Sequence, residues 1–132
     1  MKVFVTSMFF ILGILNCNSQ SHSKLNDIHP DKEFENILVK ALSSDSLSSS
    51  FIIWIKEMVK AHKHLMHTEQ VYVLEGTGMM QLGDSTYLVS SGSYIYIQKN
   101  TVHSVKVTSD TPMKVLSIQS PKFIGKDRHF IE

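Results

Sequence analysis

The stretch from His62 to Gly76 constrains the structure of this chain more than any other. His62 and His64 are two positions apart, so in an extended chain both imidazoles project from the same face. Glu69 follows five residues after His64, and the apolar run 71–74 predicts a short strand that ends at Gly76. Two imidazoles and one carboxylate at neighbouring sheet positions supply most of the ligands of a divalent metal ion. The stretch therefore predicts a β-sheet that carries a metal site.

A fourth ligand has to come from another part of the chain, and His103 is the best candidate. In the segment 102–107, His103 shares one face of a predicted strand with Val105 and Val107. Such alternation is typical of a barrel strand whose histidine points inward.

The spacing from His62 to Gly76 resembles the first conserved motif of the cupin superfamily, without a gap or an insertion. The resemblance covers roughly residues 50 to 120. It implies an all-β fold, the antiparallel double-stranded β-helix (the jelly-roll or cupin barrel). It also implies a metal site, with the ligands His62, His64, Glu69 and His103.

The second cupin motif is matched in part. Gly92 and His103 stand where the motif has its first glycine and its histidine. Gln98 and Val107 replace the proline and the final asparagine, and Asn100 replaces an inner glycine. Asn100 is compatible with the motif because asparagine tolerates the left-handed conformation that glycine would supply.

The rest of the body also predicts short strands separated by turns, which favours an antiparallel sandwich or small barrel. Residues 34–42 fit a strand better than a short helix, and the serine-rich segment 43–50 predicts a loop. Further strands are predicted at 51–55, 78–82, 86–90, 94–97, 102–107 and 113–119. One conflict arises before the histidines, because Lys56 and Lys60 have the same strand parity as His62. A bulge or turn between Lys56 and His62 would resolve it.

The ends of the chain predict export. Residues 1–16 carry one lysine and a long apolar run, which fits a signal peptide better than a buried N-terminal helix. Cys17, the only cysteine, follows this run like the lipidated cysteine of a bacterial lipoprotein, although ordinary cleavage nearby is an equal alternative. We therefore expect a periplasmic, secreted or lipid-anchored protein, with no membrane contact other than the lipid.

The predicted domains are a signal peptide (1–16), a flexible arm (17–33), a cupin barrel (34–120) and a C-terminal tail (121–132). In the tail, Asp127 and Arg128 suggest a surface ion pair. The 132 residues have room for one domain. Thirteen Lys and Arg against twelve Asp and Glu give no excess charge, which argues against a nucleic-acid partner.

Several side chains have two interpretations. Trp54 is expected to pack in the core, with ligand stacking as the alternative, and Tyr72, Tyr94 and Tyr96 could line the cavity or lie outside it. His67 is expected beside the metal ligands or at the surface, rather than as a fifth ligand. The apolar run 51–55 suggests a homodimer, because an exposed strand needs cover.

Three histidines and one glutamate suit Fe, Mn, Ni or Zn and leave coordination positions open. The resemblance implies either an oxygenase or isomerase that acts on a small organic molecule, or a non-catalytic module that binds a small ligand. The sequence assigns no catalytic residue and no organic cofactor, since no second carboxylate or lysine stands convincingly beside the metal. A third alternative, four solvated side chains that bind nothing, also stays open.

Overall fold

The computed structural model describes residues 21–131. The expectations about the signal peptide and Cys17 lie outside these residues. Within the described part, no helix has the length and hydropathy needed to cross a lipid bilayer. A short 3-10 helix, η1 (Leu25–Asp27), precedes the strands.

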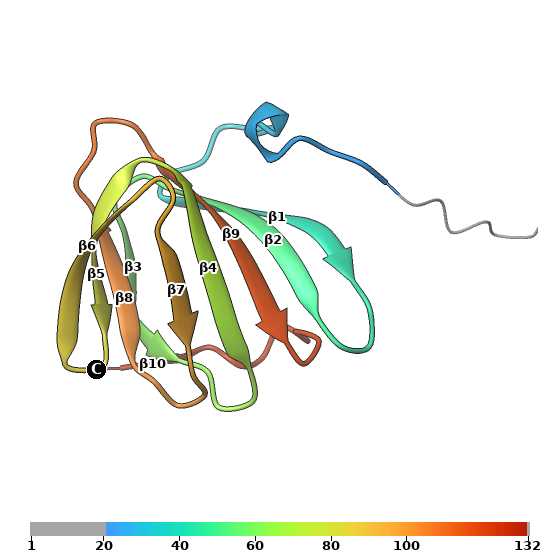
Figure 1. The fold of residues 1–132 in the computed structure, drawn as a ribbon, viewed down its shortest axis with the longest axis vertical. Coiled ribbons are helices and arrows are strands. Elements are labelled where there is room, and N and C mark those ends of the chain that lie inside the picture. Colours follow the sequence, from blue (N-terminus) through green and yellow to red (C-terminus); the bar gives the residue numbers. More distant parts are fainter. Residues whose placement is uncertain (1–20, 132) are drawn as a thin grey trace, which may run out of the picture.

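Within residues 21–131, ten strands form two antiparallel five-stranded sheets (Figure 1). This confirms the all-β antiparallel fold that the sequence predicts. The first sheet has the order β1 (Ile37–Ser44), β2 (Ser49–Ile55), β9 (Met113–Ser120), β4 (Thr68–Glu75) and β7 (Tyr94–Ile97). The second has the order β10 (His129–Phe130), β3 (Met58–Lys63), β8 (His103–Val107), β5 (Thr77–Leu82) and β6 (Ser85–Ser90). Strands that are neighbours within a sheet are often distant in sequence, such as β4 and β9, so the sheets fix residues from the whole chain relative to one another.

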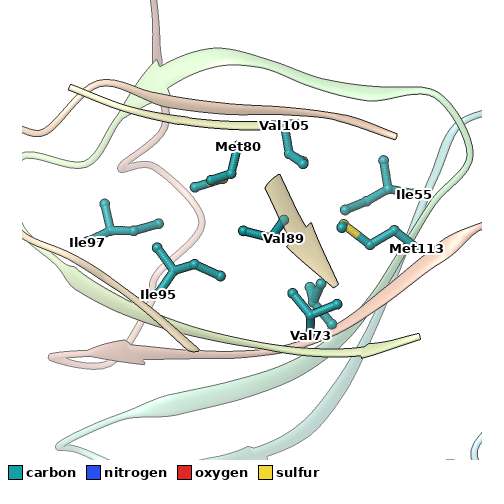
Figure 2. Packing of buried hydrophobic residues seen from close by; sticks show 9 residues of the cluster. Ile55, Val73, Met80, Val89, Ile95, Ile97, Val105 and Met113 are labelled. Atoms are coloured by element: carbon teal, nitrogen blue, oxygen red, sulfur yellow. The ribbon is translucent and has the colours of Figure 1, made fainter. Parts of the chain in front are cut away.

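The main core fills the space between the two sheets (Figure 2). Every second residue of the strands points inward, and these residues are mostly β-branched, which suits a pleated and buried surface. The buried members of this cluster are Ile55, Val73, Met80, Val89, Ile95, Ile97, Val105, Met113 and Val115. The inward-facing polar residues His62, Glu69 and His103 line the same interior cavity as this cluster.

A second, smaller cluster lies on the outer face of the first sheet. It consists of Leu38, Ile52 and Trp54, with Leu25, Ile28, Phe34, Leu74 and Leu116 packed against them. Trp54 is therefore a core residue, as expected, and it does not line the cavity between the sheets. The segment 17–33 was expected to be a flexible arm, yet Leu25 and Ile28 pack on this face because they cover apolar surface that the sheet would otherwise expose.

The serine-rich loop predicted at 43–50 is shorter than expected. Ser43 and Ser44 belong to β1, and Ser49 and Ser50 to β2. The Oγ atoms of Ser43 and Ser50 lie 2.6 Å apart, and those of Ser44 and Ser49 lie 2.9 Å apart. The prediction was wrong because these hydroxyls pair across the hairpin instead of competing with the backbone for hydrogen bonds.

Gly76, the last residue of the first motif, closes the turn between β4 and β5. Its φ is +82°, and a Cβ atom there would lie 2.8 Å from the Cα of Met113. We expect Gly76→Ala to lower the free energy of unfolding by about 1–3 kcal/mol, because both the left-handed backbone and the close approach disfavour a side chain.

Gly83→Ala is the matched control for Gly76→Ala in urea denaturation. Gly83 also has a positive φ, of +58°, but no atom lies within 4 Å of the position that a Cβ would take there. The Gly76 variant should therefore lose more stability than the Gly83 variant. Equal losses would show that the contact with Met113 has no energetic consequence.

Candidate metal centre

Two antiparallel strands bring three histidines together. His62 in β3 is the register partner of His103 in β8, and His64 follows directly after β3. Their ring centroids lie 4.1 Å apart for His62 and His103, 5.1 Å for His62 and His64, and 5.3 Å for His64 and His103. One nitrogen from each ring falls within 4.8 Å of the other two, and all three side chains are buried. The structure thus assembles the three histidines that the sequence predicts.

The bulge predicted ahead of His62 is present. The pairing of β3 with β8 shifts by one residue between Val59 and His62. The alternation of side chains between the two faces of the sheet is therefore reset at this point. Lys56 and Lys60 are consequently exposed while His62 is buried. The bulge resolves the conflict between lysine and histidine positions.

The second motif supports His64 through its backbone. Asn100 has a φ of +62°, the left-handed conformation expected at the position of the motif's inner glycine. The N–H of Asn100 donates a hydrogen bond of 2.6 Å to the carbonyl oxygen of His64. The asparagine therefore preserves the turn that places β8 beside His64.

The hydrogen bonds of the three rings determine which nitrogen is available to a ligand. The Nδ1 atom of His62 lies 2.8 Å from the carbonyl oxygen of Lys60, and that of His103 lies 2.9 Å from the carbonyl oxygen of Thr101. The Nδ1 atom of His64 bonds the carbonyl oxygen of Asp127. A carbonyl only accepts, so each Nδ1 carries the hydrogen and each Nε2 of a neutral ring keeps its lone pair.

The Nε2 atoms of His64 and His103 are buried and have no hydrogen-bond partner. A buried polar atom without a partner costs free energy, so the arrangement is explained best by a ligand that accepts two lone pairs at once. A divalent transition metal does this, and backbone carbonyls on the opposite nitrogens are the usual support of metal-binding histidines. The residues present therefore fit a metal ion.

Glu69, in β4, faces the histidines from the opposite sheet. Its Oε2 lies 3.4 Å from the Nε2 atoms of both His64 and His103. Its Oε1 accepts hydrogen bonds from the hydroxyl of Ser117 and, at 3.3 Å, from the amide of Gln119. Burial alone would favour the neutral form of Glu69, whereas the hydrogen bonds from Ser117 and Gln119 to Oε1 favour the ionised form. Glu69 is thus an ionised carboxylate beside the three-histidine group.

Ser117 and Gln119 were missed in the sequence. Both lie in β9 at inward positions, where Met113 and Val115 are apolar. Polar residues at inward positions of a predicted strand were the available signal, because such residues need a buried partner.

The C-terminal segment supplies a second unexpected part of the site. Asp127 was expected at the surface in an ion pair with Arg128, yet it is only 4% exposed. Its carboxylate accepts the backbone N–H groups of Leu65, Met66 and His67 and also bonds the His67 ring. The ion-pair prediction was wrong because three N–H groups of one loop converge on the Asp127 carboxylate.

Asp127 and His67 support the site from outside it. Burial would raise the pKa of the Asp127 carboxyl, but the His67 ring and the backbone N–H groups outweigh it and keep that pKa well below its usual value. The second nitrogen of His67 bonds the carbonyl oxygen of Lys122 at 3.0 Å. Since both its nitrogens are engaged, His67 lies beside the ligands as expected and offers none of its own.

The buried position of His62 has a consequence for stability. Burial, followed by the neighbouring His103, lowers the pKa of His62 from 6.5 to about 4. The unfolded chain therefore binds this proton near pH 6.5 and the folded chain only near pH 4. The contribution of the neutral His62 ring to the free energy of unfolding is fully present above pH 6.5. It is lost as the pH falls from 6.5 towards 4, because the unfolded state binds more protons than the folded state in this range.

We expect the metal-free protein to lose stability between about pH 6.5 and pH 5, measured as the urea midpoint. His62→Asn should make this dependence shallower. His29→Asn, which removes an exposed histidine, is the control and should leave it unchanged. Identical pH dependence in the wild type and the His62 variant would contradict the prediction.

The site opens into a cavity of about 80 Å³ between the sheets. Its walls are mostly valine, isoleucine and methionine, and the charged side chains that line it are Glu69 and Arg128. Tyr72, Tyr94 and Tyr96 are exposed on the outer face of the first sheet and do not line this cavity. The cavity can therefore surround a small molecule with apolar contacts beside the histidines.

Comparison with known proteins agrees with this geometry. Residues 50–119 match a family model described as a cupin domain. This chain belongs to the cupin family. An uncharacterized protein of Methanocaldococcus jannaschii is 34% identical over 71 residues, which cover 54% of this chain and 57% of that protein. An uncharacterized protein of Aquifex aeolicus is 32% identical over 98 residues, 74% of this chain and 80% of that protein.

A solved structure confirms the fold of this cupin. It is an uncharacterized conserved protein with a double-stranded β-helix domain from Klebsiella pneumoniae, with a TM-score of 0.70. The identity is 14%, and the alignment covers 86% of this chain and 98% of that one. The predicted double-stranded β-helix is thus confirmed.

Proposed function

We propose that this cupin binds one divalent transition metal through His62, His64, His103 and Glu69, and that it acts on a small organic molecule as an oxygenase or isomerase. The observation that carries the proposal is the pair of buried Nε2 atoms without partners, on His64 and His103. Fe, Mn, Ni and Zn all suit three imidazoles and one carboxylate.

When bound, the metal would supply Lewis-acid or redox chemistry at a coordination position left open by the four ligands. The chain's own residues perform the supporting tasks. The carbonyl oxygens of Lys60, Thr101 and Asp127 fix the orientation of the three rings, and Ser117 and Gln119 fix Glu69. The apolar walls offer valine, isoleucine and methionine contacts to the body of the substrate.

A second candidate function is non-catalytic binding of a small ligand. The observation that favours it is the composition of the cavity lining. Among the described residues that form this lining, Glu69 is the one carboxylate and none is a lysine. A proton-transfer reaction would need a further base near the metal. Turnover that is lost in Glu69→Ala would favour the enzyme, whereas ligand binding without turnover would favour the binding module.

Export and assembly are further parts of the proposal. The apolar run within residues 1–16 supports export, with lipidation of Cys17 or ordinary cleavage as the two routes. The sequence suggests a homodimer because the apolar run 51–55 would need cover if it formed an exposed strand. In the structure this run belongs to β2, which lies between β1 and β9 and is not an edge strand, so this reason does not apply. Ile37 and Val39 of the edge strand β1 are exposed and are the surface that a second copy would cover. Light scattering of the mature protein tests this.

Elemental analysis of the mature protein, purified without chelator or a histidine tag, tests the metal. About one metal per chain is expected, and the double variant His62→Ala/His103→Ala should lose it. The matched control His22→Ala/His29→Ala removes two exposed histidines and should keep it. Iron would direct the assays to oxygen uptake; manganese, nickel or zinc would direct them to isomerisation. Protein that is empty and takes up no added metal would overturn the proposal.

A further inference from the structure

Arg128 is the one arginine or lysine among the described residues that line the metal-site cavity. It directly precedes β10, in which Phe130 pairs with His62 and His129 pairs with Lys63. One more step along this antiparallel register leads from His129 to Arg128 and from Lys63 to His64. Arg128 has the same strand parity as Phe130, whose ring centroid lies 6.0 Å from that of His62. Arg128 is exposed and contributes to the cavity lining, so the C-terminal segment places a positive charge at the edge of the cavity that holds the histidines.

No carboxylate of the described residues pairs with this charge. Arg128 takes part in no ion pair within residues 21–131. The carboxylate of the adjacent Asp127 is occupied by the loop 65–67. The other carboxylate in the cavity, Glu69, is held by Ser117 and Gln119 on one oxygen and faces two histidines with the other.

The electrostatics of the cavity favour an anion. A divalent metal together with Glu69 and Arg128 leaves an excess of positive charge in a site with apolar walls. Attraction is stronger in such surroundings than in water, because the local dielectric constant is lower. A guanidinium also offers two parallel N–H donors, which match the two oxygens of a carboxylate.

We propose that Arg128 binds the carboxylate of the substrate, so that this site takes small organic acids with an apolar body. The inference rests on the proposed function and adds the substrate class to it. The carboxylate lies on Arg128, the apolar body lies against the valine and isoleucine walls, and the reacting part faces the metal. A cavity of about 80 Å³ limits the buried part to a few non-hydrogen atoms, since one water occupies roughly 10–15 Å³ on this scale.

Binding of 3-methylbutanoate and of its neutral amide, 3-methylbutanamide, tests the proposal. Both are titrated into zinc-loaded protein, and NMR chemical-shift changes report the dissociation constants. Metal content is measured on the same samples. The acid should bind about 10- to 100-fold more tightly than the amide, as expected for a charge-assisted pair.

Variants assign this preference to Arg128. Arg128→Gln should reduce the preference for the acid by about tenfold, because the charge of the metal remains, and Arg128→Lys should keep more of the preference than Arg128→Gln does. Lys126→Gln removes a positive charge two residues earlier, outside the cavity, and should leave the preference unchanged. All variants should hold as much zinc as the wild type, because Arg128 is not a ligand.

Two results would overturn the inference. One is equal affinity of the wild type for the acid and the amide, including no binding of either. The other is a preference for the acid that is as large in Arg128→Gln as in the wild type. Failure of the proposed metal function has a different signature, which is the absence of bound zinc in the wild type. Titration of the metal-free protein with the same acid and amide would then test whether Arg128 binds the carboxylate without the metal.

Discussion

Replacement of Asp127 by alanine should lower the free energy of unfolding by about 3–5 kcal/mol. The reason is that one carboxylate satisfies three backbone N–H groups, those of Leu65, Met66 and His67, as well as the His67 ring. Its removal leaves the two buried donors of His67, and the part-buried N–H groups of Leu65 and Met66, without acceptors. Urea denaturation of the metal-free protein measures the loss.

Asp84→Ala is the control for Asp127→Ala, since Asp84 is an exposed residue between β5 and β6. It should change stability by no more than about 0.5 kcal/mol. The Asp127 variant should also bind metal about 10- to 100-fold more weakly, because the Asp127 carboxylate anchors to loop 65–67 the segment whose backbone carbonyl orients His64. A loss as small as that of the control would mean that the loop 65–67 has other support.

Saturating metal should raise the free energy of unfolding by about 4 kcal/mol when free metal exceeds its dissociation constant a thousandfold. The folded chain holds the ligands together, whereas the unfolded chain does not, so binding stabilises the folded state. Thermal unfolding with and without Zn²⁺ measures the effect, and a chelator should reverse it.

The double variant His62→Ala/His103→Ala should lack this metal-dependent stabilisation. Its metal-free form is the reference, because removal of buried rings changes stability by itself. The control His22→Ala/His29→Ala should gain as much from metal as the wild type. Equal stabilisation of both double variants would place the bound metal elsewhere on the chain.

The three-histidine group could be predicted because its geometry depends on local rules. His62 and His64 share a face through strand parity, and His103 shares its face with Val105. The bulge between Val59 and His62 was also predictable, since without it lysines would occupy the ligand face. These inferences need only the alternation of side chains along strands.

The support of the site depends on contacts that no local pattern records. His64 bonds a carbonyl 63 residues further along the chain, and the Asp127 carboxylate meets a loop at a similar separation. In the sequence, Asp127 beside Arg128 is typical of a solvated tail. The cross-strand serine pairs were missed for the same reason, because register between strands is set by the whole sheet.

The pairing of β10 with β3 has a consequence for the synthesis of this protein. Ribosomes make the chain from its N-terminus, so residues 58–64 emerge long before Asp127 and Phe130 do. Until then, His64 lacks the carbonyl that fixes its ring, and the loop after it lacks its carboxylate. A nascent chain thus contains His62, His64, Glu69 and His103 before the last strand can fix their arrangement. The ring of His64 acquires its fixed orientation only after that strand has been made.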